Sequence, residues 1–157
     1  MSTRGGIGFG PDGTHWKARY HHFDSYPDGL GKTLFDLHRG FFGRDVADMQ
    51  RVLFDEHPAG WSSINDTDFT LAPGYTMNPD DRRPRCYCHG ERHEDQDYYW
   101  TPDTFDEEWC YVITPNHQMY VFRPMPYGKK GARLVATVDL DGPEPDWGDL
   151  GVEEDDL

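Results

Sequence analysis

The feature that most limits how this chain can fold is a stretch of more than 40 residues, from 61 to about 104, in which no hydrophobic period holds for long. The stretch is rich in Pro, Asp, Arg and His. Structureless loops longer than about 15 residues are uncommon inside compact domains, because burial does not offset the entropy lost when they become ordered. We therefore expect a specific crosslink to hold this part of the chain in place.

The same stretch contains a cluster of cysteines and histidines. All three cysteines, Cys86, Cys88 and Cys110, lie within 25 residues, and His89 and His93 follow the first two. Zinc favours four tetrahedral thiolate and imidazole ligands, and three cysteines with one histidine form a common structural set. We predict a structural zinc site formed by Cys86, Cys88, His93 and Cys110, with Cys110 at the start of a strand. A closed site of this kind stabilises the fold and performs no chemistry.

The residues alone leave alternatives open at this cluster. His89 is a possible ligand in place of His93, although adjacent ligands at Cys88 and His89 would strain the geometry. The cysteines could also be buried reduced thiols that act as small apolar side chains. A disulfide is disfavoured, because the number of cysteines is odd and the N-terminal residues lack the apolar stretch of a secretion signal.

The remaining sequence predicts one α+β domain over residues 1–140. Extended segments at 7–10 and 15–23 flank an Asp-Gly turn, which is typical of a β-hairpin. Strand-like runs at 109–113, 118–123 and 132–140 are joined by short turns and therefore predict a three-stranded antiparallel meander. Apolar residues spaced by three and four predict two helices, one with Leu30, Leu34, Leu37 and Phe41 and one with Val46, Met49 and Leu53. We expect an antiparallel sheet made of the hairpin and the meander, two helices and a zinc-pinned loop.

The charge of the chain is strongly negative and unevenly distributed. There are 15 Lys and Arg residues against 29 Asp and Glu, for a net charge of −14, and nine of the acidic residues lie between 139 and 157. We expect residues 141–157 to form a solvated acidic tail, or to dock on a basic partner through Trp147 and Leu150. Nucleic acid is disfavoured as a partner, because it needs clustered Lys and Arg. No apolar run approaches the roughly 20 residues that span a membrane, so a cytoplasmic protein is expected.

The densest polar and aromatic segment runs from 21 to 33, between a predicted strand and a predicted helix. The N-terminus of a helix presents unpaired amides to an anion. We predict a pocket for a small anionic, nucleotide-like ligand, in which imidazole and Lys meet negative charge, Tyr stacks and glycine amides hold phosphate oxygens. The residues assigned to this pocket are His21, His22, Asp24, Tyr26, Gly29, Gly31 and Lys32.

Two other interpretations of this segment are weaker. The sequence Gly31-Lys32-Thr33 matches the end of a phosphate loop, but Tyr26 stands where the first glycine of that motif belongs. Ser25 with its neighbouring His and Asp could suggest a catalytic triad, yet residues this close in sequence do not easily align as nucleophile, base and orienting group. A buried hydrogen-bonded turn is the simpler structural interpretation of Ser25.

Residues 21–27 resemble a group of small, largely uncharacterised proteins from actinobacteria and bacteriophages. Their pattern is (Cys/His)-His-Trp-Asp-(Gly/Ser)-Tyr-Pro, and here it reads His-His-Phe-Asp-Ser-Tyr-Pro, with Phe23 in place of Trp and Ser25 in place of the commoner Gly. The likeness extends more loosely through 55–61 and 86–93. The resemblance implies a bacteriophage or actinobacterial setting and no mechanism.

These observations lead to three hypotheses of function. The first is a small zinc-stabilised binding protein with a pocket for an anionic ligand. The second is an acidic inhibitor or immunity-type protein that binds a basic protein partner through charge complementarity. The third is a zinc-dependent hydrolase, which would require an open coordination position for water. Whether the protein is an enzyme is left open by the sequence.

Overall fold

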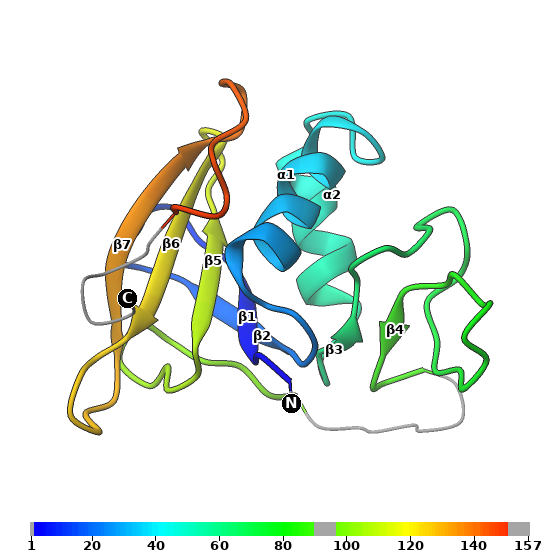
Figure 1. Ribbon diagram of the computed structural model, residues 1–157, viewed down its shortest axis with the longest axis horizontal. Coiled ribbons are helices and arrows are strands. Elements are labelled where there is room, and N and C mark those ends of the chain that lie inside the picture. The colour runs from blue at the N-terminus through cyan, green and yellow to red at the C-terminus, as the bar shows by residue number, and fades with distance from the viewer. Residues whose placement is uncertain (1, 90–96, 151–157) are drawn as a thin grey trace.

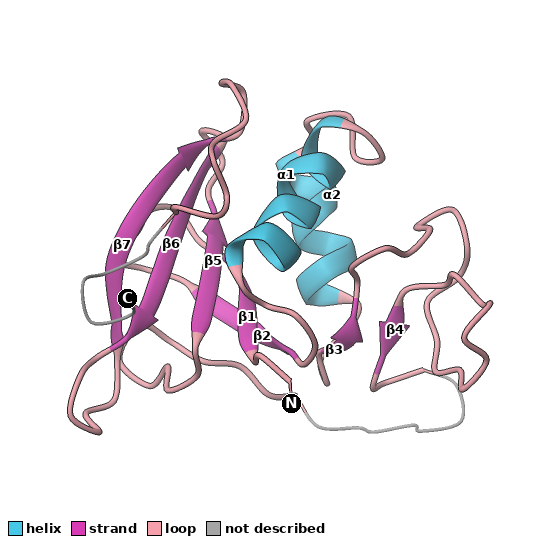
Figure 2. Cartoon of the chain, in the orientation of Figure 1, coloured by secondary structure: helices cyan, strands magenta, loops and turns pink. Residues whose placement is uncertain are grey.

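The computed structural model describes residues 2–89 and 97–150 (Figures 1 and 2). It contains a seven-stranded sheet in the order β4-β3-β2-β1-β5-β6-β7, and two short helices cover one face of that sheet (Figure 1). The strands are β1 (Gly5–Phe9), β2 (Lys17–His21), β3 (Trp61–Ser63), β4 (Arg85–Cys86), β5 (Trp109–Ile113), β6 (Gln118–Pro124) and β7 (Ala132–Asp139). The helices are α1 (Lys32–Arg39) and α2 (Val46–Gln50), with π-helical turns η1 (Pro27–Gly31) before α1 and η2 (Arg51–Asp55) after α2.

The segments with clear local patterns form the expected elements. β1 and β2 pair antiparallel, and β5, β6 and β7 follow one another as antiparallel neighbours. The second helix begins where the carboxylate of Asp45 accepts a hydrogen bond from the Asp48 amide, which satisfies one of the unpaired donors of its first turn. Local hydrophobic spacing therefore located these strands and helices.

The predicted fold class is nevertheless wrong, because the sheet is mixed and not antiparallel. β1 pairs with β5 in parallel, with Gly5 opposite Trp109, and β2 pairs with β3 in parallel at His21 and Trp61. The chain between β2 and β5 forms the two helices, β3 and β4 before it returns to the sheet beside β1. A parallel pair of strands needs a long connection of this kind. Hydrophobic spacing shows which segments are strands, but it does not show which distant strand lies beside which.

The central strands separate two apolar clusters. Along β5, Tyr111 and Ile113 face the helices, whereas Cys110 and Val112 face the opposite side. The helical side is the main core, and the opposite side contains a smaller cluster around Trp100. Side chains that alternate between two buried faces explain why every residue of β5 is buried.

The segment after β7 packs on the domain, although the sequence predicts that the domain ends at 140. Trp147 is buried in the main core, and its ring meets Phe35 of α1 edge to face with the centroids 5.6 Å apart. The Trp147 indole donates to Glu144 at 2.9 Å, and Glu144 also pairs with Lys32 at 3.2 Å. The packed structure therefore continues through Trp147 to Leu150, while residues 151–157 of the predicted tail lie outside the described residues.

None of the helices in the described residues is both long enough and apolar enough to cross a bilayer.

Candidate metal centre

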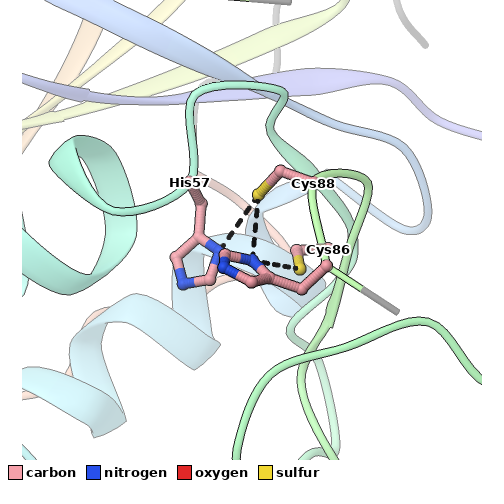
Figure 3. A group of neighbouring side chains, drawn as sticks. His57, Cys86 and Cys88 are labelled. Atoms are coloured by element: carbon pink, nitrogen blue, oxygen red, sulfur yellow. Dashed lines mark hydrogen bonds between the residues drawn. The ribbon is translucent and has the colours of Figure 1, made fainter. Parts of the chain in front are cut away.

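Four potential metal ligands gather between the end of η2 and the edge strand β4. One ligand atom from each of His57, Cys86, Cys88 and His89 lies within 4.8 Å of all the others, and the labelled side chains point toward one another (Figure 3). The Cys88 sulfur lies 3.3 Å from His57 Nδ1 and 3.2 Å from His89 Nδ1, and the Cys86 sulfur lies 3.4 Å from the same His89 nitrogen. Ligand atoms on one tetrahedral zinc ion lie about 3.3–3.8 Å apart, so these three sulfur–nitrogen distances are close to the spacing that the ion requires.

The turn that carries His57 is built on Gly60. Gly60 has φ +82°, and a Cβ there would lie 2.7 Å from the Tyr20 carbonyl oxygen, so the turn requires glycine. The Gly60 amide donates to the His57 carbonyl at 3.0 Å, and the Trp61 ring lies against the imidazole with centroids 4.3 Å apart. These contacts fix the direction in which the His57 ring points.

Arg19 of β2 contacts the same turn through hydrogen bonds from its side chain. Its guanidinium is buried and donates to the carbonyl oxygens of Phe54, Pro58 and Tyr98, and it forms an ion pair with Asp97 at 2.6 Å. A buried guanidinium stays favourable only when its donors are satisfied, which is the case here. Arg19 therefore joins the end of η2 to the chain that returns at 97–98.

The cysteines are placed by the pairing of β3 with β4. Cys86 lies opposite Trp61, the Tyr87 amide donates to the Gly60 carbonyl at 3.1 Å, and the Tyr75 amide donates to the His89 carbonyl at 3.1 Å. Cys86, Cys88 and His57 are buried, and only His89 is exposed. Three of the four side chains are thus shielded from solvent, and the fourth is accessible to it.

The electrostatics of the group favour a bound cation. Hydrogen bonds from the Cys86 thiol and then from the His57 ring lower the pKa of the Cys88 thiol, whereas the hydrogen bond to Cys88 and burial raise the pKa of Cys86. The pair therefore shares one negative charge beside two imidazoles, and the thiolate is the form that binds metals. Two sulfur and two nitrogen ligands suit a borderline-soft ion such as zinc.

The structure brings together two of the four predicted zinc ligands, Cys86 and Cys88. Cys110 is not part of the group: it lies on β5, four strand spacings or roughly 19 Å from β4, and faces the second apolar cluster. Burial raises the pKa of the Cys110 thiol, as expected for a small apolar side chain. His93 lies outside the described residues, and His89, the alternative that the sequence left open, is in the group.

Sequence reasoning missed His57 as a ligand. No motif spacing joins it to the cysteine pair, because it lies 29 positions before Cys86. The available signals were its place between a helical pattern and the Pro-Ala-Gly turn, and its inclusion in the loose resemblance over 55–61. All three cysteines are free thiols, so the histidines and not a disulfide complete the group.

The residues predicted to bind an anion do not all share one site. Asp24, Tyr26, Gly29 and Lys32 line a cleft of about 250 Å³ together with Asp28, Thr33, Asp36, Asn65 and Asp66. Gly31 packs against the rings of Tyr111 and Trp147, and His22 contacts the hydroxyl of Ser2 at 3.1 Å. Only part of the predicted set therefore faces the cleft.

His21 is fully buried and has a structural role in the turn after β2. The Ile64 amide donates to His21 Nε2 at 3.1 Å, so the proton lies on Nδ1 and is donated to Ser25 Oγ at 2.9 Å. Burial, followed by the charge of His22, lowers the pKa of His21 to about 3. Because the ring is a donor to Ser25, it does not accept the hydroxyl proton, and the pair is not arranged as a nucleophile and its base.

The charge of the cleft opposes an anionic ligand. Four carboxylates line it, from Asp24, Asp28, Asp36 and Asp66. Its one lysine, Lys32, is paired with Asp36 and with Glu144 at 3.2 Å each. A cleft with this balance attracts positive charge and repels phosphate.

Comparisons of the chain with family models, curated proteins and solved structures give no match. Two features of the side chains indicate function: the four-ligand group and the acidic cleft.

Proposed function

We propose that this protein is a small binding protein whose fold is stabilised by a structural zinc ion held by His57, Cys86, Cys88 and His89. The observation that supports the proposal is the convergence of these four ligand atoms, from two separate parts of the chain, within 4.8 Å of one another. Zinc is preferred because it takes tetrahedral sulfur and nitrogen ligands and needs no redox chemistry.

A structural role fits better than a catalytic one. Four protein ligands fill a tetrahedral shell and leave no position for a reactive water. The segment 64–84, which the structure describes in full, contains no helix or strand, and only three of its residues are buried. An ion that joins the end of η2 to β4 closes a loop around this segment, and structural zinc contributes of order 10 kcal/mol of apparent binding free energy in small domains.

Metal analysis of the purified protein tests this proposal. After dialysis against metal-free buffer, we expect one zinc ion per chain and a melting temperature that falls when a strong chelator is added. Cys88→Ser should lose the zinc, whereas Cys110→Ala, the matched control that removes a buried thiol outside the group, should keep it. Protein that contains no metal and melts identically with and without chelator would contradict the proposal.

The acidic cleft supports a second statement, about what the protein binds. We infer that the cleft receives a cationic side chain of a basic protein partner, as expected for an inhibitor or immunity-type protein. Four carboxylates and the partly exposed ring of Tyr26 are the groups that bind guanidinium and ammonium ions. The volume of about 250 Å³ suits one side chain and is below the roughly 300–1,000 Å³ of pockets for whole small molecules. The net charge of −14 would also accelerate encounter with a basic surface.

Calorimetric titration with an arginine-rich peptide, and separately with ATP, tests this inference. We expect the peptide to bind, more weakly as salt is added, and ATP not to bind. The double variant Asp28→Asn with Asp66→Asn should weaken peptide binding at least tenfold. Asp55→Asn with Asp103→Asn, which removes the same two charges outside the cleft, should change it little. Binding of ATP without binding of the peptide would overturn the inference and favour the nucleotide-like ligand.

A further inference from the structure

A second group of potential metal ligands lies at the other end of α1 from the acidic cleft. His38 in the last turn of α1, His117 in the turn between β5 and β6, and Asp141 after β7 offer ligand atoms within 4.8 Å of one another. His38 Nε2 and His117 Nδ1 share a hydrogen bond of 2.8 Å, and His117 Nδ1 lies 3.9 Å from an Asp141 carboxylate oxygen. Three distant parts of the sequence therefore bring two imidazoles and a carboxylate to one place.

The spacing of these atoms is close to that of ligands on one ion. Nitrogen and oxygen atoms that each bind a metal at about 2.0–2.2 Å lie roughly 2.9–3.5 Å apart. The 2.8 Å and 3.9 Å separations lie just outside this range on either side. One oxygen of Asp141 is held by Arg44, and the other oxygen faces the imidazole of His117.

Backbone hydrogen bonds and the side chain of Arg39 hold the turns that carry His117 and Asp141 in place. His117 adopts a left-handed conformation with φ +64°, and its carbonyl accepts a hydrogen bond from the Leu140 amide at 2.9 Å. The side chain of Arg39 donates to the carbonyl oxygens of Leu140 and Gly142. The turn that carries Asp141 is thus tied to α1 and to the β5–β6 turn without any contribution from a metal.

Solvent reaches this group, in contrast to the cysteine centre. His117 is about one-third exposed and forms part of the wall of an open cleft of about 530 Å³ beside Arg44, Val46 and Pro115. Three protein ligands leave at least one coordination position for water or for another ligand, which is the pattern of open metal sites. Two imidazoles and one carboxylate suit divalent transition ions such as Zn²⁺, Co²⁺ and Ni²⁺.

We propose that His38, His117 and Asp141 form a second, exchangeable site for a divalent transition metal ion, with water from the cleft completing its coordination. Two observations make this site weaker than the cysteine centre. Arg39 and Arg44 bring positive charge close to the ion. Within the described residues, the Nδ1 atom of His38 is buried without a hydrogen-bond partner, so no second-shell acceptor of the kind that tight histidine ligands have is seen there.

Titration of the dialysed protein with Zn²⁺ or Co²⁺ tests this proposal by calorimetry and thermal melting. We expect one further equivalent of metal to bind and the melting temperature to rise with metal concentration, as linkage requires. His117→Asn should abolish this second equivalent, and asparagine is chosen because it tolerates the left-handed conformation. Asp141→Asn should weaken it at least tenfold, and Asp149→Asn, the same change outside the group on the same segment, should leave it unchanged.

The outcomes separate this proposal from the structural zinc. Failure of the wild-type protein to bind a further equivalent would overturn the second site, as would full binding by the His117→Asn variant. Neither result affects the zinc that resists dialysis at the cysteine centre. Conversely, a chain that lacks tight zinc but still takes up one ion through His117 would support the second site and contradict the first.

Discussion

The two ends of the sheet are stabilised by different forces. At the end formed by β1, β5, β6 and β7, alternating side chains such as Ile7, Tyr111 and Ile113 are fully buried beneath the helices. At the other end, β3 has three residues and β4 has two, and nearly all of the 64–84 segment between them is half-buried or exposed. Apolar burial therefore explains the first end, whereas the second end contains the Arg19 contacts, the short β3–β4 pairing and the four-ligand group.

The two ends are therefore vulnerable to different perturbations. Removal of a metal should act on the β3–β4 end and leave the end formed by β1, β5, β6 and β7 intact. That end is held by apolar contacts, which a chelator does not affect. Removal of a buried aromatic side chain should do the reverse. The two perturbations together measure whether the ends unfold as one unit or as two.

The largest effect is expected from removal of zinc. Hydrogen exchange with and without a strong chelator should show faster exchange for amides in 61–89, while β5 and β6 stay protected. We expect a local loss of several kcal/mol, since structural zinc contributes of order 10 kcal/mol in the smallest domains. Equal acceleration at both ends would show that the sheet unfolds as one unit, and unchanged exchange at 61–89 would show that no metal holds this segment.

Replacement of Trp147 by Ala should have the next largest effect, at the opposite end. The ring fills the main core against Phe35 and Gly31, and loss of a buried aromatic side chain costs about 3–5 kcal/mol. Urea denaturation measures this change, and zinc content should be unaffected. Tyr127→Ala, which removes an aromatic side chain that is 97% exposed, is the matched control and should change stability by less than about 0.5 kcal/mol. A small effect of Trp147→Ala would restore the picture of a solvated tail after residue 140.

The sequence was most informative where the physical signal is local. Helical spacing and strand alternation located α1, α2, the β1–β2 hairpin and the β5–β7 meander. The parallel pairing of β1 with β5 left no such local signal, because it depends on how closely side chains of neighbouring strands approach β1. A Cβ at Gly8 would lie 3.0 Å from Val112 of β5 and 3.2 Å from Ala18 of β2. Small residues on one face of β1 were the trace of this contact, and they became meaningful only once the neighbours were known.

The same distinction applies to the proposed metal ligands. Cys86 and Cys88 were identifiable because their spacing is local. His57 joins them only through the packing of η2 against β3 and β4. Cys110 and Val112 lie two positions apart on β5, so their side chains point to the same side of the sheet, toward the second apolar cluster. This strand periodicity was a signal against Cys110 as a ligand. The role of Trp147 as a core residue was hidden by the acidic residues around it.

The smallest expected effect concerns His21, which lies where the two ends meet, paired through the backbone with Trp61. Burial lowers the pKa of His21 in the folded state to about 3, below the ordinary value of 6.5. Below pH 6.5 the unfolded chain therefore binds a proton that the folded chain excludes, and stability is lost as the pH falls, by about 1.4 kcal/mol per unit until the folded pKa is reached. Urea denaturation at pH 7 and pH 5.5 should show this loss in the wild type and a shallower pH dependence in His21→Gln, whose amide oxygen still accepts from the Ile64 amide. Loss of zinc in acid affects both proteins alike, so the difference between their slopes isolates His21, and equal slopes would mean that the ring is protonated as readily in the fold as in the unfolded chain.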